Sequence, residues 1–266
     1  VSKKDKPENQ DNRKQGEVWK EEIGAMEQMF TAISSVKDTR SVWQNFIWGT
    51  PSISFEIANS SNSEEIVFFI SIPKKFRESI EKQIHSFFPN AVLERSDDYT
   101  IFSPGSFTEA SVLTLKKKYI YPIKTYENLD VDPLNAITNA LSKLKTKEEG
   151  AAIQLVMRPA GTHWRAKGKG IAHKMQQGKR LKDADRSLLS TVEKGVGDTI
   201  YAMAGPSKKD DSSLSNPKPV QLTPEEQEIL KSIENKSSKT GFKANIRLVA
   251  SAETQERAKE ILGQLE

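Results

Sequence analysis

Residues 51–73, PSISFEIANSSNSEEIVFFISIP, carry the pattern that decides the fold. Ile53, Phe55 and Ile57 alternate with polar residues, which predicts a strand that is buried on one face. Residues 66–73, IVFFISIP, form a β-branched and aromatic run that favours a central strand ending at its proline. The turn-rich residues between the two runs predict that the strands pair as a hairpin.

A helix and a short strand are predicted after this hairpin. Apolar side chains recur at helical spacing from Phe76 to Phe87, just before Pro89. Residues 91–95 have the composition of a short strand. Residues 96–109 include two aspartates, a proline and a glycine, so we expect them to be mostly loop.

A similar order of elements recurs up to residue 159. Residues 111–125 are predicted to be extended, with an interruption at Pro122, and Asp132 is suited to cap a helix. Residues 151–157, AAIQLVM, form another strong strand. Residues 49–159 therefore predict an α+β domain of the ferredoxin-like class, with a β-β-α-β and then a β-α-β order in one sheet and helices on one face.

The segments before this domain differ in composition. Residues 1–16 hold one aliphatic side chain, and we expect them to be a flexible leader. Residues 17–48 contain an apolar stripe from Trp19 to Ile33, which is typical of an amphipathic helix docked on a core.

The segments after the domain predict a linker and a further unit. Residues 160–222 are expected to be a basic insertion followed by a low-complexity linker. Residues 223–266 predict a helix with a capping box, a strand and a last helix, for which Gly263 is a candidate stop signal. We expect the strand, residues 242–250, to join the sheet that contains residues 151–157 or to start a second, similar unit.

The composition excludes several classes of protein. The 266 residues include 40 Lys+Arg, 36 Asp+Glu, three histidines and no cysteine, which rules out disulfides, thiolate metal sites and cysteine nucleophiles. No apolar run approaches the roughly 18 residues of a membrane span. Because the chain starts without a methionine or a signal peptide, we expect it to be cut from a longer protein, with Glu266 as a second boundary.

No catalytic motif emerges from the sequence. The pairs Gly168-Lys169 and Gly178-Lys179 lack both the glycine five residues earlier and the following hydroxyl that a phosphate-binding loop requires. The aspartate pairs at 97–98, 130/132 and 210–211 are explained by turns and helix caps, without a metal. We therefore predict that this chain is not an enzyme and holds no metal or cofactor.

One stretch is strongly basic. Residues 160–182 carry seven cationic side chains and no carboxylate; the first carboxylate after them is Asp183. Because the net charge of the whole chain is +4, the remaining residues together carry a net charge of −3. A flexible Gly/Lys segment of this kind suits phosphate contacts with nucleic acid or anionic lipid, and a plain solvated insertion is the alternative. Trp164 could stack on a base, although an aromatic tucked against the domain is the commoner arrangement. The cations are Arg165, Lys167, Lys169, Lys174, Lys179, Arg180 and Lys182.

The order of the segments resembles one family. Six segments resemble the region before the motor domain in bacterial conjugative-transfer and type IV secretion ATPases of the coupling-protein kind. These segments are GAMEQMFTAI, SISFEIA, FFISIPKKF, PNAVLE, DPLNAI…AAIQLVMRP and GFKANIRLVA. The resemblance covers residues 17–159 and 223–266. No catalytic residue is carried over, because the nucleotide motif of that family is absent from this chain.

The resemblance implies a non-catalytic cytoplasmic N-terminal module, placed at the inner face of the cell membrane through a parent chain. Its partners would be secretion-channel proteins or the motor domain of the same chain, and it would support transfer of DNA or protein cargo. An oligomer and contact with an anionic membrane surface are compatible with this expectation. The alternative is a free-standing α+β protein that binds nucleic acid without sequence specificity through residues 160–182.

Overall fold

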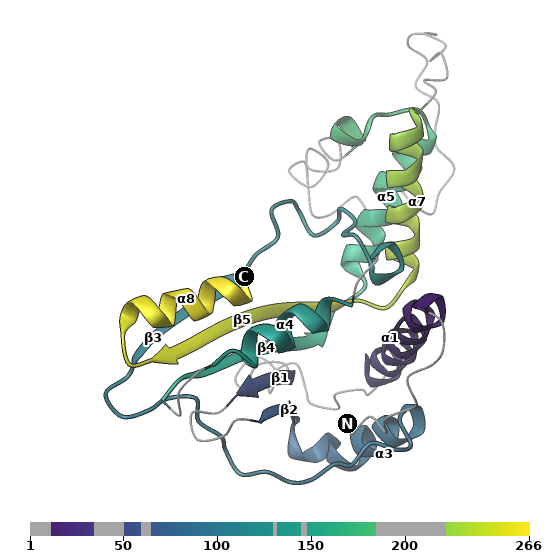
Figure 1. Ribbon diagram of the computed structural model, residues 1–266. Coiled ribbons are helices and arrows are strands. Elements are labelled where there is room, and N and C mark those ends of the chain that lie inside the picture. The colour runs from purple at the N-terminus through teal and green to yellow at the C-terminus, as the bar shows by residue number, and fades with distance from the viewer. Residues whose placement is uncertain (1–11, 35–50, 60–64, 130–131, 145–147, 185–221) are drawn as a thin grey trace, which may run out of the picture. The chain divides into compact units, whose positions relative to one another are not determined.

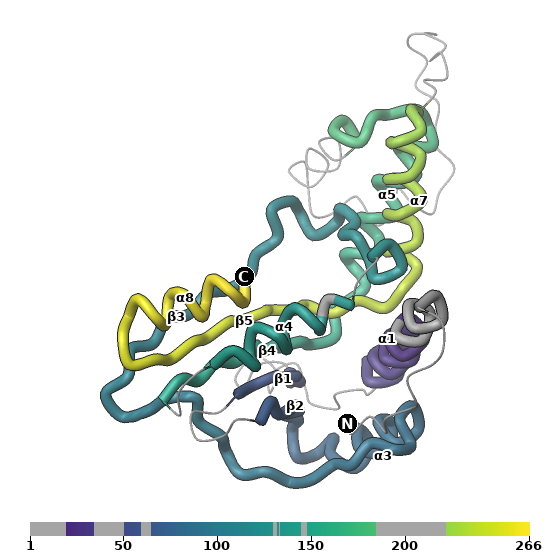
Figure 2. Tube along the Cα trace, viewed as in Figure 1, coloured from purple at the N-terminus to yellow at the C-terminus, as the bar shows by residue number. Residues whose placement is uncertain are grey.

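The computed structural model describes residues 12–34, 51–59, 65–129, 132–144, 148–184 and 222–266 (Figures 1 and 2). The chain divides into two compact units. The sheet unit contains residues 1–116, 124–159 and 241–266, and the helical unit contains residues 117–123 and 160–240. The helical unit is thus formed largely by the connection between two neighbouring strands of the sheet unit.

The sheet unit is built on a five-stranded antiparallel sheet with the strand order β2-β1-β4-β5-β3 (Figure 1). This sheet confirms the α+β class. The strands are β1 (Ile53–Asn59), β2 (Ile66–Ser71), β3 (Phe107–Leu113), β4 (Gly150–Pro159) and β5 (Phe242–Ala252).

Helices of the sheet unit cover one face of this sheet. Phe55 on β1 packs in a cluster with Met29 and Ile80, and Ile57 on the same face of β1 packs in a cluster with Leu141 and Ile261. The helices are α1 (Asn12–Ser34), α3 (Arg77–Phe87), which follows the short helix η1 (Lys74–Phe76), α4 (Pro133–Leu141), which follows η2 (Tyr126–Asn128), and α8 (Gln255–Leu265). This arrangement confirms the prediction of helices on one face.

The hairpin at residues 51–73 is confirmed, but its second strand is wrongly placed by the sequence. β1 and β2 pair in the register Ser54↔Ser71 to Asn59↔Ile66. β2 lies at an edge of the sheet, whereas β4 and β5 lie between other strands. The sequence predicted a central position for β2 because the run IVFFIS is apolar on both faces. This pattern normally indicates a strand that is covered on both sides.

The predictions for residues 91–125 are also wrong in detail. Residues 91–106 contain no strand, and β3 begins at Phe107, inside the segment that was expected to be loop. Part of the segment crosses the sheet face that the helices leave uncovered. Ile101 packs there with Ala152, and the ring of Tyr99 stacks on Phe69 at 4.2 Å between centroids.

Several helix boundaries follow from local chemistry. The Asp132 side chain accepts a hydrogen bond from the backbone N–H of Leu134, and Thr223 and Glu226 form the predicted capping box. Two boundaries differ from expectation: α1 starts at Asn12, inside the expected leader, and α8 continues through Gly263 to Leu265. The rest of the leader, residues 35–48 and most of the expected linker lie outside the described residues.

The predicted strand at 242–250 joins the same sheet as residues 151–157. β5 pairs with β4 from Gly150↔Ser251 to Pro159↔Phe242. Ile246 is only half-buried in β5, whereas Leu248 is fully buried. The buried apolar positions of this strand are therefore Leu248, Ala250 and Ala252, and an acidic substitution at Ile246 is expected to have a smaller effect than one at Leu248.

A buried carboxylate lies on the uncovered face of the sheet. Glu56 on β1 accepts hydrogen bonds from the Tyr99 hydroxyl at 2.5 Å, from Ser54 Oγ at 2.8 Å and from Gln154 Nε2 at 3.0 Å. Burial raises the pKa of Glu56, but the three hydrogen bonds together outweigh it and hold this pKa below its ordinary value. Burial and the bond to Glu56 raise the pKa of Tyr99.

Replacing Glu56 with glutamine is expected to lower the free energy of unfolding by about 2 kcal/mol at neutral pH. Because the folded pKa lies below the unfolded one, this contribution is present above the unfolded pKa and is lost as the pH falls through the folded value. The difference between parent and variant in urea unfolding should therefore shrink below the ordinary pKa of 4.5. A difference that does not change with pH would contradict this account of Glu56.

Candidate functional site

The basic stretch is helical and forms half of the helical unit. Residues 163–176 make up α5 (His163–Gln176), which packs side by side with α7 (Pro224–Ser238) in Figure 1. Ile171 and Met175 of α5 are fully buried in a cluster with Ile233 of α7 and Ile120. The expectation of a flexible Gly/Lys segment at 160–182 is therefore wrong.

The glycines that suggested flexibility have structural tasks. Gly168 lies where α5 approaches α7, and a Cβ there would overlap with Ser237 Oγ and lie 3.3 Å from Ile120 Cδ1. Gly178 adopts a φ of 86° just after α5. The N–H groups of Gly178 and Lys179 donate to the carbonyls of Met175 and Lys174, which is a Schellman cap.

Replacing Gly168 with alanine is expected to destabilise the helical unit by about 1–3 kcal/mol, because the added methyl overpacks the contact with α7. This outcome opposes helix propensity, which favours alanine by about 1 kcal/mol. Ser237 Oγ is buried and has no hydrogen-bond partner among the described residues. Ser237→Ala should therefore be tolerated alone and should restore most of the loss in the double variant, as measured by hydrogen exchange in α5 and α7.

The structure separates the seven predicted cations into two groups. Lys169, Lys179, Arg180 and Lys182 are exposed, whereas Arg165, Lys167 and Lys174 are partly buried. Lys167 Nζ lies 5.7 Å from the ring centroid of Tyr119. Burial, together with the nearby charge of Lys179, lowers the pKa of Lys174. The exposed group, which we call the α5 basic cluster, is the part that remains available for phosphate contacts.

Trp164 is partly buried at the start of α5. Its indole nitrogen is buried and has no hydrogen-bond partner among the described residues. The guanidinium of Arg165 lies 5.9 Å from its ring centroid. The partial burial of Trp164 agrees with an aromatic tucked against the domain, and stacking on a base stays a prediction.

A partly buried lysine, Lys236, anchors the short segment 117–123 of the helical unit. Lys236 Nζ donates to the backbone oxygens of Tyr119 and Tyr121 at 2.5 and 2.9 Å, and burial lowers the pKa of Lys236. The two bonds fix residues 117–123 against α7, which holds Ile120 in the core of the unit.

A second basic surface, which the sequence did not suggest, lies at one end of the sheet. The strands β2, β4 and β3 end there and β5 begins there, which brings together exposed cations that are scattered in the sequence. The described residues at this end, 51–52, 72–75, 114–116, 158–159 and 242–245, contain no carboxylate. We call this surface the basic end; its cations are Lys74, Lys75, Lys116, Arg158 and Lys243.

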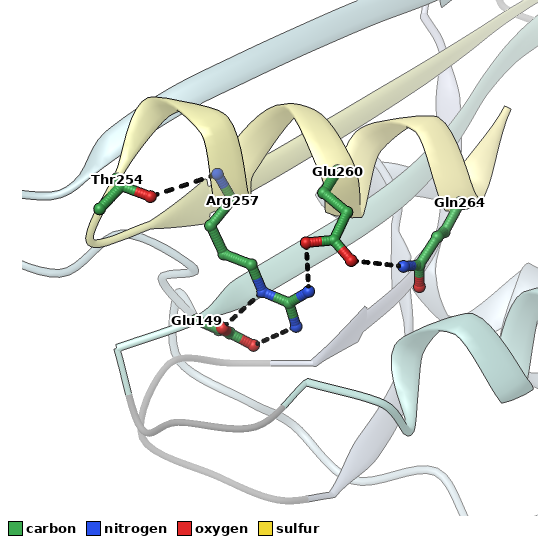
Figure 3. A network of polar contacts seen from close by, with 5 residues as sticks. All are labelled: Glu149, Thr254, Arg257, Glu260 and Gln264. Carbon is green, nitrogen blue, oxygen red and sulfur yellow. Dashed lines mark hydrogen bonds and ion pairs between the residues drawn. The ribbon is translucent and has the colours of Figure 1, made fainter.

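The opposite end of the sheet is acidic and is organised by Arg257 (Figure 3). Arg257 Nε and Nη2 donate to the two oxygens of Glu149 at 2.8 and 3.1 Å, and Nη1 lies 2.9 Å from Glu260. Glu253 is close enough to Glu148 for their hydrogen bond and like charges to raise the pKa of Glu253. No group of three or more metal-ligating side chains that could hold an ion occurs among the described residues.

A shallow pocket of about 410 Å³ lies beside this network, between the end of α4 and α8. Arg257 and Glu260 line it, but both are already engaged with each other and with Glu149 or Gln264 (Figure 3). The other lining residues are Ser142, Lys143, Leu144 and Gln264.

A protein-family model matches nearly the whole chain. Residues 18–266 match the model of a domain of unknown function, DUF8128. The chain belongs to this family. The matched region of DUF8128 spans both the sheet unit and the helical unit. No curated protein and no solved structure matches the chain.

The described part of this DUF8128 chain contains no helix with the length and apolar character needed to cross a bilayer. The longest described helix, α1 (Asn12–Ser34), carries lysines and glutamates along its length.

Proposed function

We propose that this chain is a non-catalytic module of a conjugative-transfer or type IV secretion ATPase. In this role it supports assembly of the motor at the membrane channel and the transfer of DNA or protein cargo. It acts on the cytoplasmic side of the membrane, and its partners are channel proteins or a motor domain of the same protein. The observation that carries the proposal is the order of segments, FFISIPKKF, PNAVLE and DPLNAI…AAIQLVMRP, along residues 68–159.

The chemistry of the described surfaces supports a binding role over a catalytic one. The basic end and the α5 basic cluster present exposed cations, and the carboxylates at the acidic end pair with Arg257 or with one another. Such charged surfaces steer and orient partners. A chain that positions a motor needs surfaces of this type and needs no active site of its own.

Purified residues 1–266 are expected neither to bind ATP saturably nor to hydrolyse it. Gly168 lies inside a helix against α7, and Gly178 caps a helix and is followed by Lys179 and Arg180 where a hydroxyl would be needed. Titration calorimetry and phosphate release would measure this. ATP turnover that follows the chain through successive columns would contradict the non-catalytic role.

Reading the gene beyond residue 266 tests the assignment to a motor protein. The proposal predicts a motif G-x-x-x-x-G-K-[ST] in the same frame or in a neighbouring gene, because the ATPase must supply the phosphate-binding loop. A genomic context without such a motif would contradict the proposal.

A second candidate function is non-specific nucleic-acid binding by a free-standing protein. The observation that favours it is the α5 basic cluster, in which four exposed cations lie on or just after one helix. If the four cations each contact one phosphate of duplex DNA, the logarithm of the binding constant should fall with the logarithm of the salt concentration with a slope of about −3.6. Replacing Lys169, Lys179, Arg180 and Lys182 together with alanine should remove that slope, and replacing Lys74, Lys75, Lys116 and Lys243 provides a control of equal charge. Binding to anionic vesicles, tested with the same variants, distinguishes a lipid-facing role.

A further inference from the structure

The uncovered face of the sheet has an open part over β4, β5 and β3. Gln154, Arg247 and Val112 lie in register beside Glu56, so all three side chains point to this face. Because side chains alternate along a strand, their neighbours two positions away point the same way. We call this surface the open strip; it consists of every second residue of 154–158, 243–249 and 110–112.

The open strip is positively charged. Arg158, Lys243 and Arg247 are exposed on it, and the strip contains no carboxylate. None of the three cations pairs with a carboxylate of the described residues. Arg158 and Lys243 lie directly opposite each other on β4 and β5, which places their Cβ atoms about 4.5–5.5 Å apart and makes the like charges repel. An anion bound between the two side chains would relieve this repulsion.

Arg247 is held in place on the open strip by neutral groups. Its Nη1 donates to Gln154 Oε1 at 3.2 Å, and its Nε donates to Asn245 Oδ1 at 3.3 Å. Gln154 Nε2 in turn donates to the buried carboxylate of Glu56 at 3.0 Å, which turns the amide oxygen of Gln154 toward Arg247. Arg247 Nη2 donates to no described residue. The guanidinium is therefore positioned, keeps its full charge and has donors left for a ligand.

The shape around the open strip favours a thin chain over a flat membrane surface. The crossing segment, residues 99–106, stands above the sheet next to the strip, where Ile101 packs on Ala152 of β4. The strip spans two strand spacings, about 10 Å, and residues 243–249 extend about 20 Å along β5. A planar bilayer would meet the crossing segment before it reached β5, whereas a flexible polyanion can lie along the strands.

Exposed apolar side chains accompany these cations. Phe102, which follows Ile101 in the crossing segment, is 51% exposed, and Val112 on the strip is 53% exposed. Sites for single-stranded nucleic acid combine cations that contact phosphates with aromatic rings on which bases stack. The bases of a duplex are already stacked on one another, so a ring at the surface favours unpaired bases.

We propose that the open strip binds single-stranded nucleic acid, with its phosphates at Arg158, Lys243 and Arg247 and a base stacked on Phe102. Contacts of this kind do not read sequence. The proposal does not rest on the role in secretion, because it concerns the chemistry of the sheet unit alone. It also differs from binding by the α5 basic cluster, which belongs to the helical unit.

Fluorescence anisotropy on residues 1–266 tests the open strip, with a labelled oligothymidylate of about 15 nucleotides as the probe. The triple variant Arg158→Ala, Lys243→Ala, Arg247→Ala should reduce the steepness of the log–log salt dependence by about 2, since each phosphate contact on a single strand contributes about 0.7. Lys169→Ala, Lys179→Ala, Lys182→Ala removes the same charge from the α5 basic cluster and should leave the salt dependence unchanged. All six side chains are exposed, so circular dichroism should show both variants folded.

Phe102→Ala separates base stacking from plain attraction between charges. It should weaken binding of the oligothymidylate about fivefold or more and leave binding of heparin, a polyanion without bases, unchanged. A parent chain that does not bind the oligothymidylate, equal effects of the two triple variants, or normal binding by Phe102→Ala would overturn the proposal. So would an open-strip variant that loses phosphatidylserine vesicles to the same extent as the oligothymidylate, because a lipid surface would then explain the cations.

Discussion

Replacing Arg257 with alanine is expected to lower the free energy of unfolding by about 3–5 kcal/mol. Arg257 makes a two-pronged contact with Glu149, whose side chain is only 6% exposed, and the substitution would remove both of these hydrogen bonds from a buried carboxylate. The hydrogen bonds to Glu149 and to Glu260 raise the pKa of Arg257 above its ordinary value. Urea unfolding at neutral pH measures the loss.

The exposed pair Arg77–Glu81 on α3 is the matched control. Arg77 Nε lies 2.7 Å from Glu81 Oε1, as short as the contact of Arg257, but the two side chains are 54% and 37% exposed. Solvent screens such a pair, and Arg77→Ala should therefore have a far smaller effect on the free energy of unfolding than Arg257→Ala. Equal effects of the two substitutions would show that burial of Glu149 does not decide the energy.

Replacing Gly150 with alanine is expected to destabilise the sheet unit by about 3 kcal/mol, at the upper end of overpacking effects. A Cβ at Gly150 would overlap with the carbonyl oxygen of Ile101 and lie 2.9 Å from its carbonyl carbon. These atoms belong to the backbone, so the segment that crosses the uncovered sheet face would have to move. Hydrogen exchange should show loss of protection around Ile101 and Tyr99.

Gly263→Ala provides the control for Gly150. A methyl at Gly263 meets no atom within 4 Å, and the residue lies inside α8. Alanine there should raise the free energy of unfolding by about 0.5–1 kcal/mol through helix propensity. If Gly150→Ala were as harmless, the close crossing of residues 99–101 over β4 would be wrong.

The sequence predicts elements whose signals are local. Alternation around Phe55, the Asp132 cap and the Thr223 capping box all act within a few residues, and the structure confirms each of them. Strand order depends on contacts between distant segments. β2 looks like a central strand because its own side chains are apolar on both faces, and nothing within residues 66–71 records that only β1 pairs with it.

The same distinction explains the candidate site. The basic residues at 165–182 are contiguous and easily found, but their conformation depends on Gly168 meeting Ser237 on another helix. The glycine content therefore predicted a flexible loop, whereas in the structure Gly168 allows α5 to pack closely against α7. The basic end escaped notice for a related reason. Arg158 and Lys243 are 85 positions apart in the chain, and only the pairing of β4 with β5 brings them opposite each other.

A cargo-transfer assay tests the proposed function most directly. The sequence encoding residues 49–266 would be deleted in frame in the organism of origin, and immunoblotting would confirm that the motor ATPase remains at its normal level. The proposal predicts that transfer of DNA or protein to recipient cells is lost and returns when the deleted region is restored. Transfer at the parental frequency without residues 49–266 would contradict it.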